Sequence, residues 1–269
     1  MANATELAPD TKASKFRDEF LRWEQLVWKL SEQEFEELKV KFADYPLLPY
    51  LEERKLLHRL SLKKEKAISQ FLIEYKGTVL EDRVRVPWLR YLAKRNDITR
   101  FLKYYRPVSD TQLRCHYVSF QLAAKQKTPS WNEQVKALWN VGKSQDKACD
   151  AAFQNWIANG ELNEDLVLQR IQRAAKGGQH TLIPYLKTLL RPEQQYLADV
   201  WHSVRRDPAN IRHLSRFTGE FALIESEILS YGLRRLVWRD RDLALSVFAR
   251  AQQKMTITLV KSPTILPLV

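Results

Sequence analysis

Apolar side chains recur at steps of three and four residues along most of this chain. Near its start, Phe16, Phe20, Trp23, Val27 and Leu30 follow this spacing, which places them on one face of a helix. Comparable stripes of roughly 10–16 residues follow, joined by short connections, and no run alternates apolar and polar residues for long enough to make a strand. The sequence therefore predicts an all-α protein with about fourteen helices.

The expected ends of these helices carry typical boundary residues. Ser31 and Glu34 fit a capping box, in which each side chain accepts a hydrogen bond from a free backbone N–H of the other. Pro87 is expected to open a helix that runs to Arg95, because proline is well tolerated in a first turn. The polar residues placed to cap later helices are Asp97, Asp110, Ser130, Asn163 and Asp207.

The short connections favour antiparallel helix pairs stacked in series as a right-handed superhelix, or solenoid. An irregular helical bundle is the alternative. We expect a mobile N-terminal segment over residues 1–15 and one superhelical domain over residues 16–255. Residues 256–269 are expected to form an irregular tail, because two prolines and several β-branched residues interrupt the pattern there. Such a tail is typical of frayed ends and of truncation or frameshift scars.

Charge indicates which partners to consider. Lys and Arg number 44 and Asp and Glu number 32, so the formal net charge is +12. This balance favours nucleic acid, an acidic lipid surface or an anionic cell-wall polymer. The positive residues are scattered, and clusters such as Lys63–Lys64 and Arg234–Arg235 are interpreted as solvated helix faces. No nucleic-acid-binding motif is present, so no specific nucleic-acid partner is predicted. No apolar run reaches the ~18 residues of a membrane span, and no complete signal peptide begins the sequence.

Residues for catalysis or for cofactor binding are not brought together by any motif. The five histidines never occur at metal-binding spacing, so we predict no metal and no cofactor. The segment from Gly142 to Ser144 imitates the end of a phosphate-binding loop, but Ala137 stands where that loop needs glycine. Gly142 is instead expected to follow a helix C-terminus. Cys115 and Cys149 are either buried thiols or, in an exported protein, a disulfide.

The tryptophans divide into two groups. Those on apolar stripes are expected in the core, namely Trp23, Trp139, Trp156 and Trp201. Trp88, Trp131 and Trp238 fall near predicted helix ends beside polar residues. They are interpreted as packing anchors, with an aromatic platform for a sugar ring as the alternative.

Several segments occur in an order that is informative as a set. They are DYPLLPYLE at residues 44–52, LAKRND at 92–97, LWNVGKSQ at 138–145 with ACD at 148–150, and RIQRAAKGG at 170–178. Together they resemble the soluble lytic murein transglycosylases of Gram-negative bacteria, over roughly residues 16–254. The motif residues assigned a structural role are Asp44, Tyr45, Pro46, Pro49, Tyr50, Trp139 and Gly142.

The resemblance implies a fold, a compartment and a partner. In the family, helical domains close into a periplasmic ring that carries a lysozyme-like domain. That domain cleaves the β-1,4 bond between N-acetylmuramic acid and N-acetylglucosamine and releases 1,6-anhydromuramoyl products. Cys115 and Cys149 fall where the family has a disulfide pair. Glycan strands of peptidoglycan are the implied partner, together with a catalytic domain on a longer or separate product.

The catalytic motifs of that family do not follow the helical segments here. The sequence contains no GLMQ and no AYNAGP, and only 43 residues follow Ser226 in the pair Glu225–Ser226. A lysozyme-like domain needs about 100 residues or more. Glu225 is therefore interpreted as a helix-surface carboxylate, and no catalytic residue is predicted. Two hypotheses remain: the non-catalytic helical portion of a lytic transglycosylase, or a basic α-solenoid that binds a protein or nucleic-acid partner.

Overall fold

A computed structural model of the chain describes the backbone of residues 11–261 and the side chains of residues 16–254. Within these ranges the protein has fourteen α-helices and no strand, so the predicted all-α fold class is confirmed. The helices form two compact units, residues 1–124 and residues 125–269, where the sequence pattern predicts one domain over 16–255. Each unit is described by itself.

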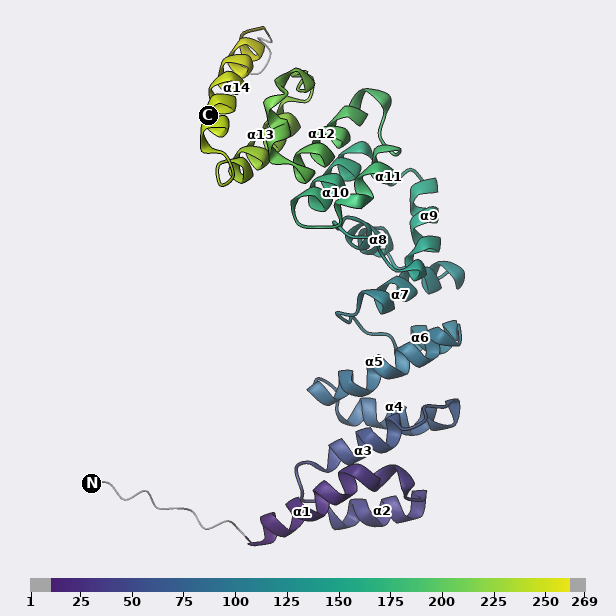
Figure 1. The fold of residues 1–269 in the computed structure, drawn as a ribbon. Coiled ribbons are helices and arrows are strands. Elements are labelled where there is room, and N and C mark those ends of the chain that lie inside the picture. Colours follow the sequence, from purple (N-terminus) through teal and green to yellow (C-terminus); the bar gives the residue numbers. More distant parts are fainter. Residues whose placement is uncertain (1–10, 262–269) are drawn as a thin grey trace, which may run out of the picture. The chain divides into compact units, whose positions relative to one another are not determined.

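The first unit is a series of helices, most of which pack against elements close by in the sequence (Figure 1). Most contacts between helices in this unit therefore join residues that are close in the sequence. The elements in order are α1 (Thr11–Leu26), η1 (Val27–Lys29), α2 (Glu32–Lys41), α3 (Leu48–Leu57), η2 (Leu62–Lys64), α4 (Glu65–Glu74), α5 (Val79–Lys94), α6 (Ile98–Tyr104) and α7 (Thr111–Ala123).

Two hydrophobic clusters hold this unit together. The first lies among α1, α2 and α3 and includes the fully buried Val27, Phe42 and Leu51. The second lies among α4 to α7 around the fully buried Trp88 and Phe101. The apolar stripe predicted over residues 16–30 thus supplies the first cluster, and burying such side chains contributes roughly 1.5–3 kcal/mol each.

The second unit continues with helices of similar length (Figure 1). Here α10 packs against α11 and α12, α12 against α13, and α13 against α14. The elements in order are α8 (Trp131–Trp139), η3 (Lys147–Cys149), α9 (Asp150–Ala158), α10 (Glu164–Lys176), η4 (His180–Leu182), α11 (Ile183–Lys187), η5 (Pro192–Gln194), α12 (Gln195–Arg206), η6 (Pro208–Arg212), η7 (Leu214–Arg216), α13 (Ala222–Leu236) and α14 (Arg241–Lys261).

Most of the predicted helix caps are confirmed. Ser31 and Glu34 form the reciprocal capping box. Side chains also accept from backbone N–H groups at four of the five other positions, namely Asp97, Asp110, Asn163 and Asp207. Ser130 precedes α8 but its side chain makes no capping hydrogen bond, so that prediction is wrong.

Pro87 lies inside a helix rather than at its start. Helix α5 begins at Val79, one residue after Thr78. An internal proline removes one helical hydrogen bond and usually costs ~3 kcal/mol. Burial of Val84, Trp88 and Leu89 on the same helix offsets that cost. The expected start at Pro87 is therefore wrong.

The predicted boundaries at both ends of the helical region also shift. Helix α1 begins at Thr11, so residues 11–15 of the segment predicted as mobile are helical. Helix α14 continues to Lys261, across the first residues of the predicted irregular tail. β-Branched residues lower helix propensity by less than about 1 kcal/mol each, whereas proline blocks the helix, and the first proline after α14 is Pro263. Residues 1–10 and 262–269 lie outside the described residues.

Several basic side chains bind the carbonyl ends of helices instead of facing solvent. Lys64 Nζ lies 2.8 Å from Lys55 O and 3.1 Å from Leu56 O, at the C-terminus of α3. Arg235 Nη1 donates to the last turn of α12, at 2.9 Å from both Val204 O and Arg205 O. Cations at helix C-termini satisfy free carbonyls and complement the helix dipole. For Lys64 and Arg235, the interpretation as solvated faces is wrong.

Candidate functional site

The motif residues of the segment 44–52 lie between α2 and α3. Tyr45 is half-buried, and its ring centroid lies 5.8 Å from those of Phe16 and Phe42. Pro49 occupies the first turn of α3. Asp44 and Pro46 are exposed. The segment therefore makes a turn that holds α3 against α1 and α2.

Tyr50 lies in the same segment at the start of α3. Its side chain is 37% exposed, and the Arg83 guanidinium lies 5.4 Å from its ring centroid. Such a contact between a cation and an aromatic ring stabilises both side chains by about 0.5–1 kcal/mol at exposed sites. Tyr50 thus links α3 to α5.

The segment after Trp139 lies along α10. The Arg170 guanidinium lies 4.5 Å from the Trp139 ring centroid, and its Nη2 donates to Lys143 O at 3.1 Å. Burial lowers the pKa of Arg170 to about 10, and a buried cation of this kind needs such partners. The motif residue Trp139 is therefore the packing partner of a buried arginine.

Gly142 makes a close contact between two backbone segments. A Cβ at Gly142 would lie 2.5 Å from Arg173 O, and a Cβ at Gly178 would lie 2.0 Å from Gly142 O. Gln179 N–H donates to Gly142 O at 2.7 Å. Gly142 has no positive φ, and the C-cap of α8 is Asn140. Gly142 does follow the C-terminus of α8, but it lies one residue beyond the predicted C′ position, and the close approach of the two backbone segments is what requires glycine there.

Both cysteines are buried and disulfide-bonded, Cys115 in α7 and Cys149 in η3. Neither is a free thiol. Of the two alternatives drawn from the sequence, the structure contains the disulfide. Such bonds persist in oxidising compartments and are rare where glutathione keeps thiols reduced.

The tryptophans do not all lie where the sequence predicts. Core positions are confirmed for Trp139, Trp156 and Trp201, each no more than 2% exposed, while Trp23 is only half-buried. Of the three predicted near helix ends, Trp88 and Trp131 are also buried, and Trp88 lies in the middle of α5, so its predicted position is wrong. Trp238 differs because 89% of it is exposed. It follows α13 and is therefore no packing anchor.

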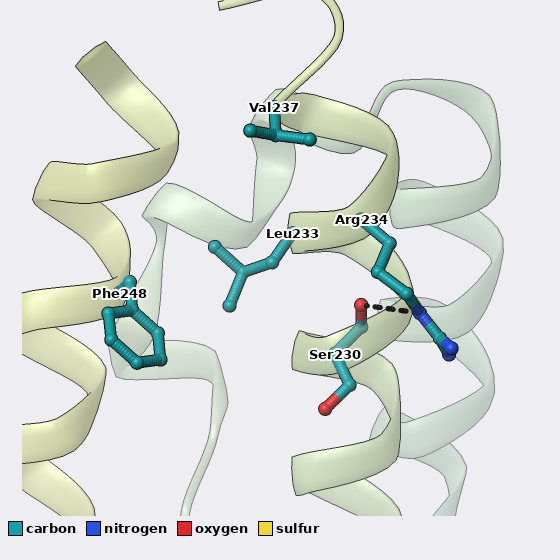
Figure 2. A pocket seen from close by; sticks show the side chains of 5 residues that line it. All are labelled: Ser230, Leu233, Arg234, Val237 and Phe248. Atoms are coloured by element: carbon teal, nitrogen blue, oxygen red, sulfur yellow. Dashed lines mark hydrogen bonds between the residues drawn. The ribbon is translucent and has the colours of Figure 1, made fainter. Parts of the chain in front are cut away.

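A shallow, largely apolar groove lies between α13 and α14, and Val237, the residue before Trp238, is part of its lining (Figure 2). Leu233 and Val237 line it from α13 and the residue after it, Phe248 faces them from α14, and Ser230 and Arg234 complete the lining. Val237 and Phe248 are 43% and 48% exposed. We call Trp238 and these lining residues the α13–α14 surface. Contiguous exposed apolar groups commonly mark a binding surface.

The spacing of apolar residues along α13 indicates this surface, although it is not among the sites predicted from the sequence. Apolar residues occur on both sides of α13, as the buried Ile228 and Leu229 and the exposed Leu223 show. A helix with apolar residues on two faces packs on two sides or binds a partner.

Glu225 is buried, at 5% exposure, so its interpretation as a helix-surface carboxylate is wrong. Its Oε1 accepts from Tyr196 OH at 2.6 Å and from Thr218 N at 2.9 Å. Its Oε2 accepts from Gly219 N at 2.9 Å. Burial, and then the hydrogen bond to Glu225, raise the pKa of Tyr196 to about 12, so the phenol remains a donor.

These contacts define the chemistry of Glu225. Backbone and hydroxyl donors surround both of its oxygens, an arrangement that suits an ionised acceptor. The carboxylate holds the turn at Gly219, whose φ is +88°, against the start of α13. The geometry is that of a structural carboxylate that fixes a turn.

Two further kinds of site are absent from the described residues. No group of three or more His, Cys, Asp or Glu side chains there is placed to hold a metal ion. None of the helices described has the length and apolar character needed to cross a bilayer.

Comparison with known proteins gives a consistent result. No protein-family model matches the chain. The soluble lytic murein transglycosylase of Salmonella typhimurium is 30% identical over 221 residues, which are 81% of this chain and 34% of that protein. Its namesake in Escherichia coli K12 is 26% identical over 247 residues, or 91% of this chain and 38% of that one.

Solved structures agree. An inactive mutant of the lytic transglycosylase Slt from Pseudomonas aeruginosa matches with a TM-score of 0.67 and 31% identity, over 87% of this chain and 38% of that one. The chain is homologous to part of the soluble lytic murein transglycosylases. The 70 kDa soluble lytic transglycosylase of E. coli matches with a TM-score of 0.70 and 25% identity, over 91% of this chain and 40% of that one.

The matched part is a minority of each transglycosylase. This chain spans between 34% and 40% of the length of the proteins named above. The family resemblance carried by the ordered sequence segments is confirmed.

Proposed function

We propose that this chain is a helical, non-catalytic part of a lytic murein transglycosylase and helps to form a ring that holds peptidoglycan glycan strands. The observation that carries the proposal is the homology over 81–91% of the chain, with a matching helical fold. The transglycosylases cleave the glycan through a catalytic domain. Here that domain belongs to a longer or a separate polypeptide. The hydrogen bonds that engage Glu225 in a turn support a structural role for this carboxylate.

The proposal includes a location and a contact. The disulfide-bonded cysteines support residence in an oxidising compartment, which for this family is the periplasm. Trp238 supports a glycan contact on the α13–α14 surface, because its exposed ring offers an apolar face to the C–H groups of a pyranose. The net charge of +12 suits a polymer whose peptide stems carry carboxylates.

Co-sedimentation with purified sacculi tests the proposal. We expect the chain to pellet with sacculi at moderate salt while the supernatant contains no anhydromuropeptides by mass spectrometry. Trp238→Ala should weaken pelleting by about threefold, on the order of 0.7 kcal/mol. Ile73→Ala is the matched control, because Ile73 is also an exposed apolar residue, at 74%, and belongs to the first unit.

Two outcomes would contradict the proposal. Release of anhydromuropeptides would show a catalytic centre in this chain, and Glu225→Gln would be the first variant to examine. Failure to pellet, combined with salt-dependent binding to DNA or RNA, would favour the basic solenoid instead.

A further inference from the structure

A polar cleft of about 560 Å³ lies beside α12 in the second unit. Four of its lining residues occur at positions i, i+3, i+4 and i+7 of α12 and so share one face of that helix. The lining residues are Asp199, His202, Ser203 and Arg206 from α12, with Asp207, Asn210 and Arg216 from the residues that follow. The cleft is separate from the α13–α14 surface.

Protein groups already neutralise both carboxylates of the cleft. Asp199 Oδ2 accepts from Lys187 Nζ at 2.7 Å. Asp207 Oδ1 accepts from Arg239 Nη1 at 3.3 Å and from Ala209 N at 3.1 Å. These two side chains therefore do not compete for the cations of the cleft.

The two arginines of the cleft have no such compensation. Within the part of the chain that the structure describes, neither Arg206 nor Arg216 has a carboxylate within ion-pair distance. Arg216 Nη1 donates instead to the neutral Ser203 Oγ at 3.2 Å. Both are exposed. Burial, and then the nearby His180 and Arg206, lower the pKa of His202, so this imidazole is uncharged at neutral pH. The cleft thus presents two guanidinium groups and a neutral hydrogen-bonding ring.

We propose that this cleft binds carboxylate groups of the peptide stems of peptidoglycan, through Arg206 and Arg216. This inference rests on the proposed function and names the chemistry that one site recognises. A guanidinium fork pairs with a carboxylate through two parallel hydrogen bonds. Each contact is weak because the arginines are exposed, and the overall affinity rises when both arginines engage carboxylates of the same stem.

Titration with a soluble probe tests the cleft directly. The probe is the free stem tripeptide L-alanyl-γ-D-glutamyl-diaminopimelate, followed by NMR of the histidine and arginine side chains. We expect saturable binding that shifts the His202 ring signals, and about tenfold weaker binding by Arg206→Gln/Arg216→Gln. The control variant Arg17→Gln/Arg106→Gln removes the same charge from exposed positions of the first unit and should bind as the wild type.

Sacculi with and without stems separate this inference from the proposed function. The cleft variant should bind intact sacculi more weakly than the control variant does, and both should bind amidase-stripped glycan equally. If sacculi pellet the wild type but the tripeptide does not bind, the cleft assignment is wrong and the proposed function stands. If the tripeptide binds through the cleft and sacculi do not, the cleft assignment stands and the proposed function fails. If duplex DNA but not tripeptide loses affinity in the cleft variant, a phosphate site replaces the carboxylate site.

Discussion

Replacing Gly178 with alanine should separate two backbone segments that now touch. The added Cβ would lie 2.0 Å from Gly142 O and 2.6 Å from Gly142 C, where ordinary contacts are longer than 3 Å. The obstacle is backbone, which cannot rotate away as a flexible side chain would. The segments must therefore move apart by about 1 Å, and Gln179 N–H, now 2.7 Å from Gly142 O, loses its acceptor.

The expected cost combines strain and a lost hydrogen bond. Overpacking typically costs about 1–3 kcal/mol, and an unsatisfied backbone donor costs about 1–3 kcal/mol. We expect Gly178→Ala to lower the free energy of unfolding by about 3 kcal/mol, equivalent to a melting temperature lower by roughly 6–12 °C for a unit of this size.

Urea unfolding followed by tryptophan fluorescence measures this cost, because Trp139, Trp156 and Trp201 are buried in the second unit. Gly177→Ala is the matched control. A Cβ there meets nothing within 4 Å, and its φ of −163° lies outside the left-handed region that favours glycine. The control should stay within about 0.5 kcal/mol of the wild type. Equal free energies of unfolding for the two variants would refute the close-contact argument.

Three other outcomes follow from contacts elsewhere. The hydrogen bonds from Arg100, Lys103 and Tyr104 lower the pKa of Glu65 to about 2. The ionised carboxylate therefore stabilises the fold above about pH 4.5, and this contribution is lost as the pH falls toward 2. Over that range, acid unfolding should show the wild type losing its stability advantage over Glu65→Gln. Gly232→Ala, whose Cβ would lie 2.2 Å from Ile211 Cγ2, should cost about 1–3 kcal/mol and less in an Ile211→Ala background, as a double-mutant cycle would measure. Thiol titration of oxidised, denatured protein should find no free thiol, and the same titration after reduction should find two free thiols. Two free thiols before reduction would contradict the disulfide.

Local signals in the sequence were sufficient for the fold class and for five of the six predicted helix caps. The capping side chains of Ser31, Asp97 and Asn163 accept from backbone N–H groups three residues later, so their spacing alone reveals them. Pro87 shows the limit of this approach. Its local preference for a first turn is overridden by burial of Trp88 and Leu89 against other helices.

The candidate sites depended on contacts that no local pattern contains. Glu225 is buried because Tyr196, 29 residues earlier, donates to it. Lys64 and Arg235 bind the ends of helices that precede them in the sequence, so part of the positive charge is used within the fold. Counting charges therefore overstates how much basic surface remains for a partner. Trp238 looked like Trp88 and Trp131 in sequence, and only packing distinguishes it.

The contacts between the α8–α9 connection and α10 have a consequence for changes in chain length. Asn140 Nδ2 donates to Gln169, Lys143 O accepts from Arg170, and Gly142 touches the backbone at Gly178. Most surface loops tolerate insertions because doubling their length costs only about 0.6 kcal/mol of closure entropy. Here an inserted residue would put every later contact out of register with a rigid helix. Deletions and insertions between Trp139 and Gln145 should therefore be far less tolerated than substitutions of the exposed side chains in the same segment.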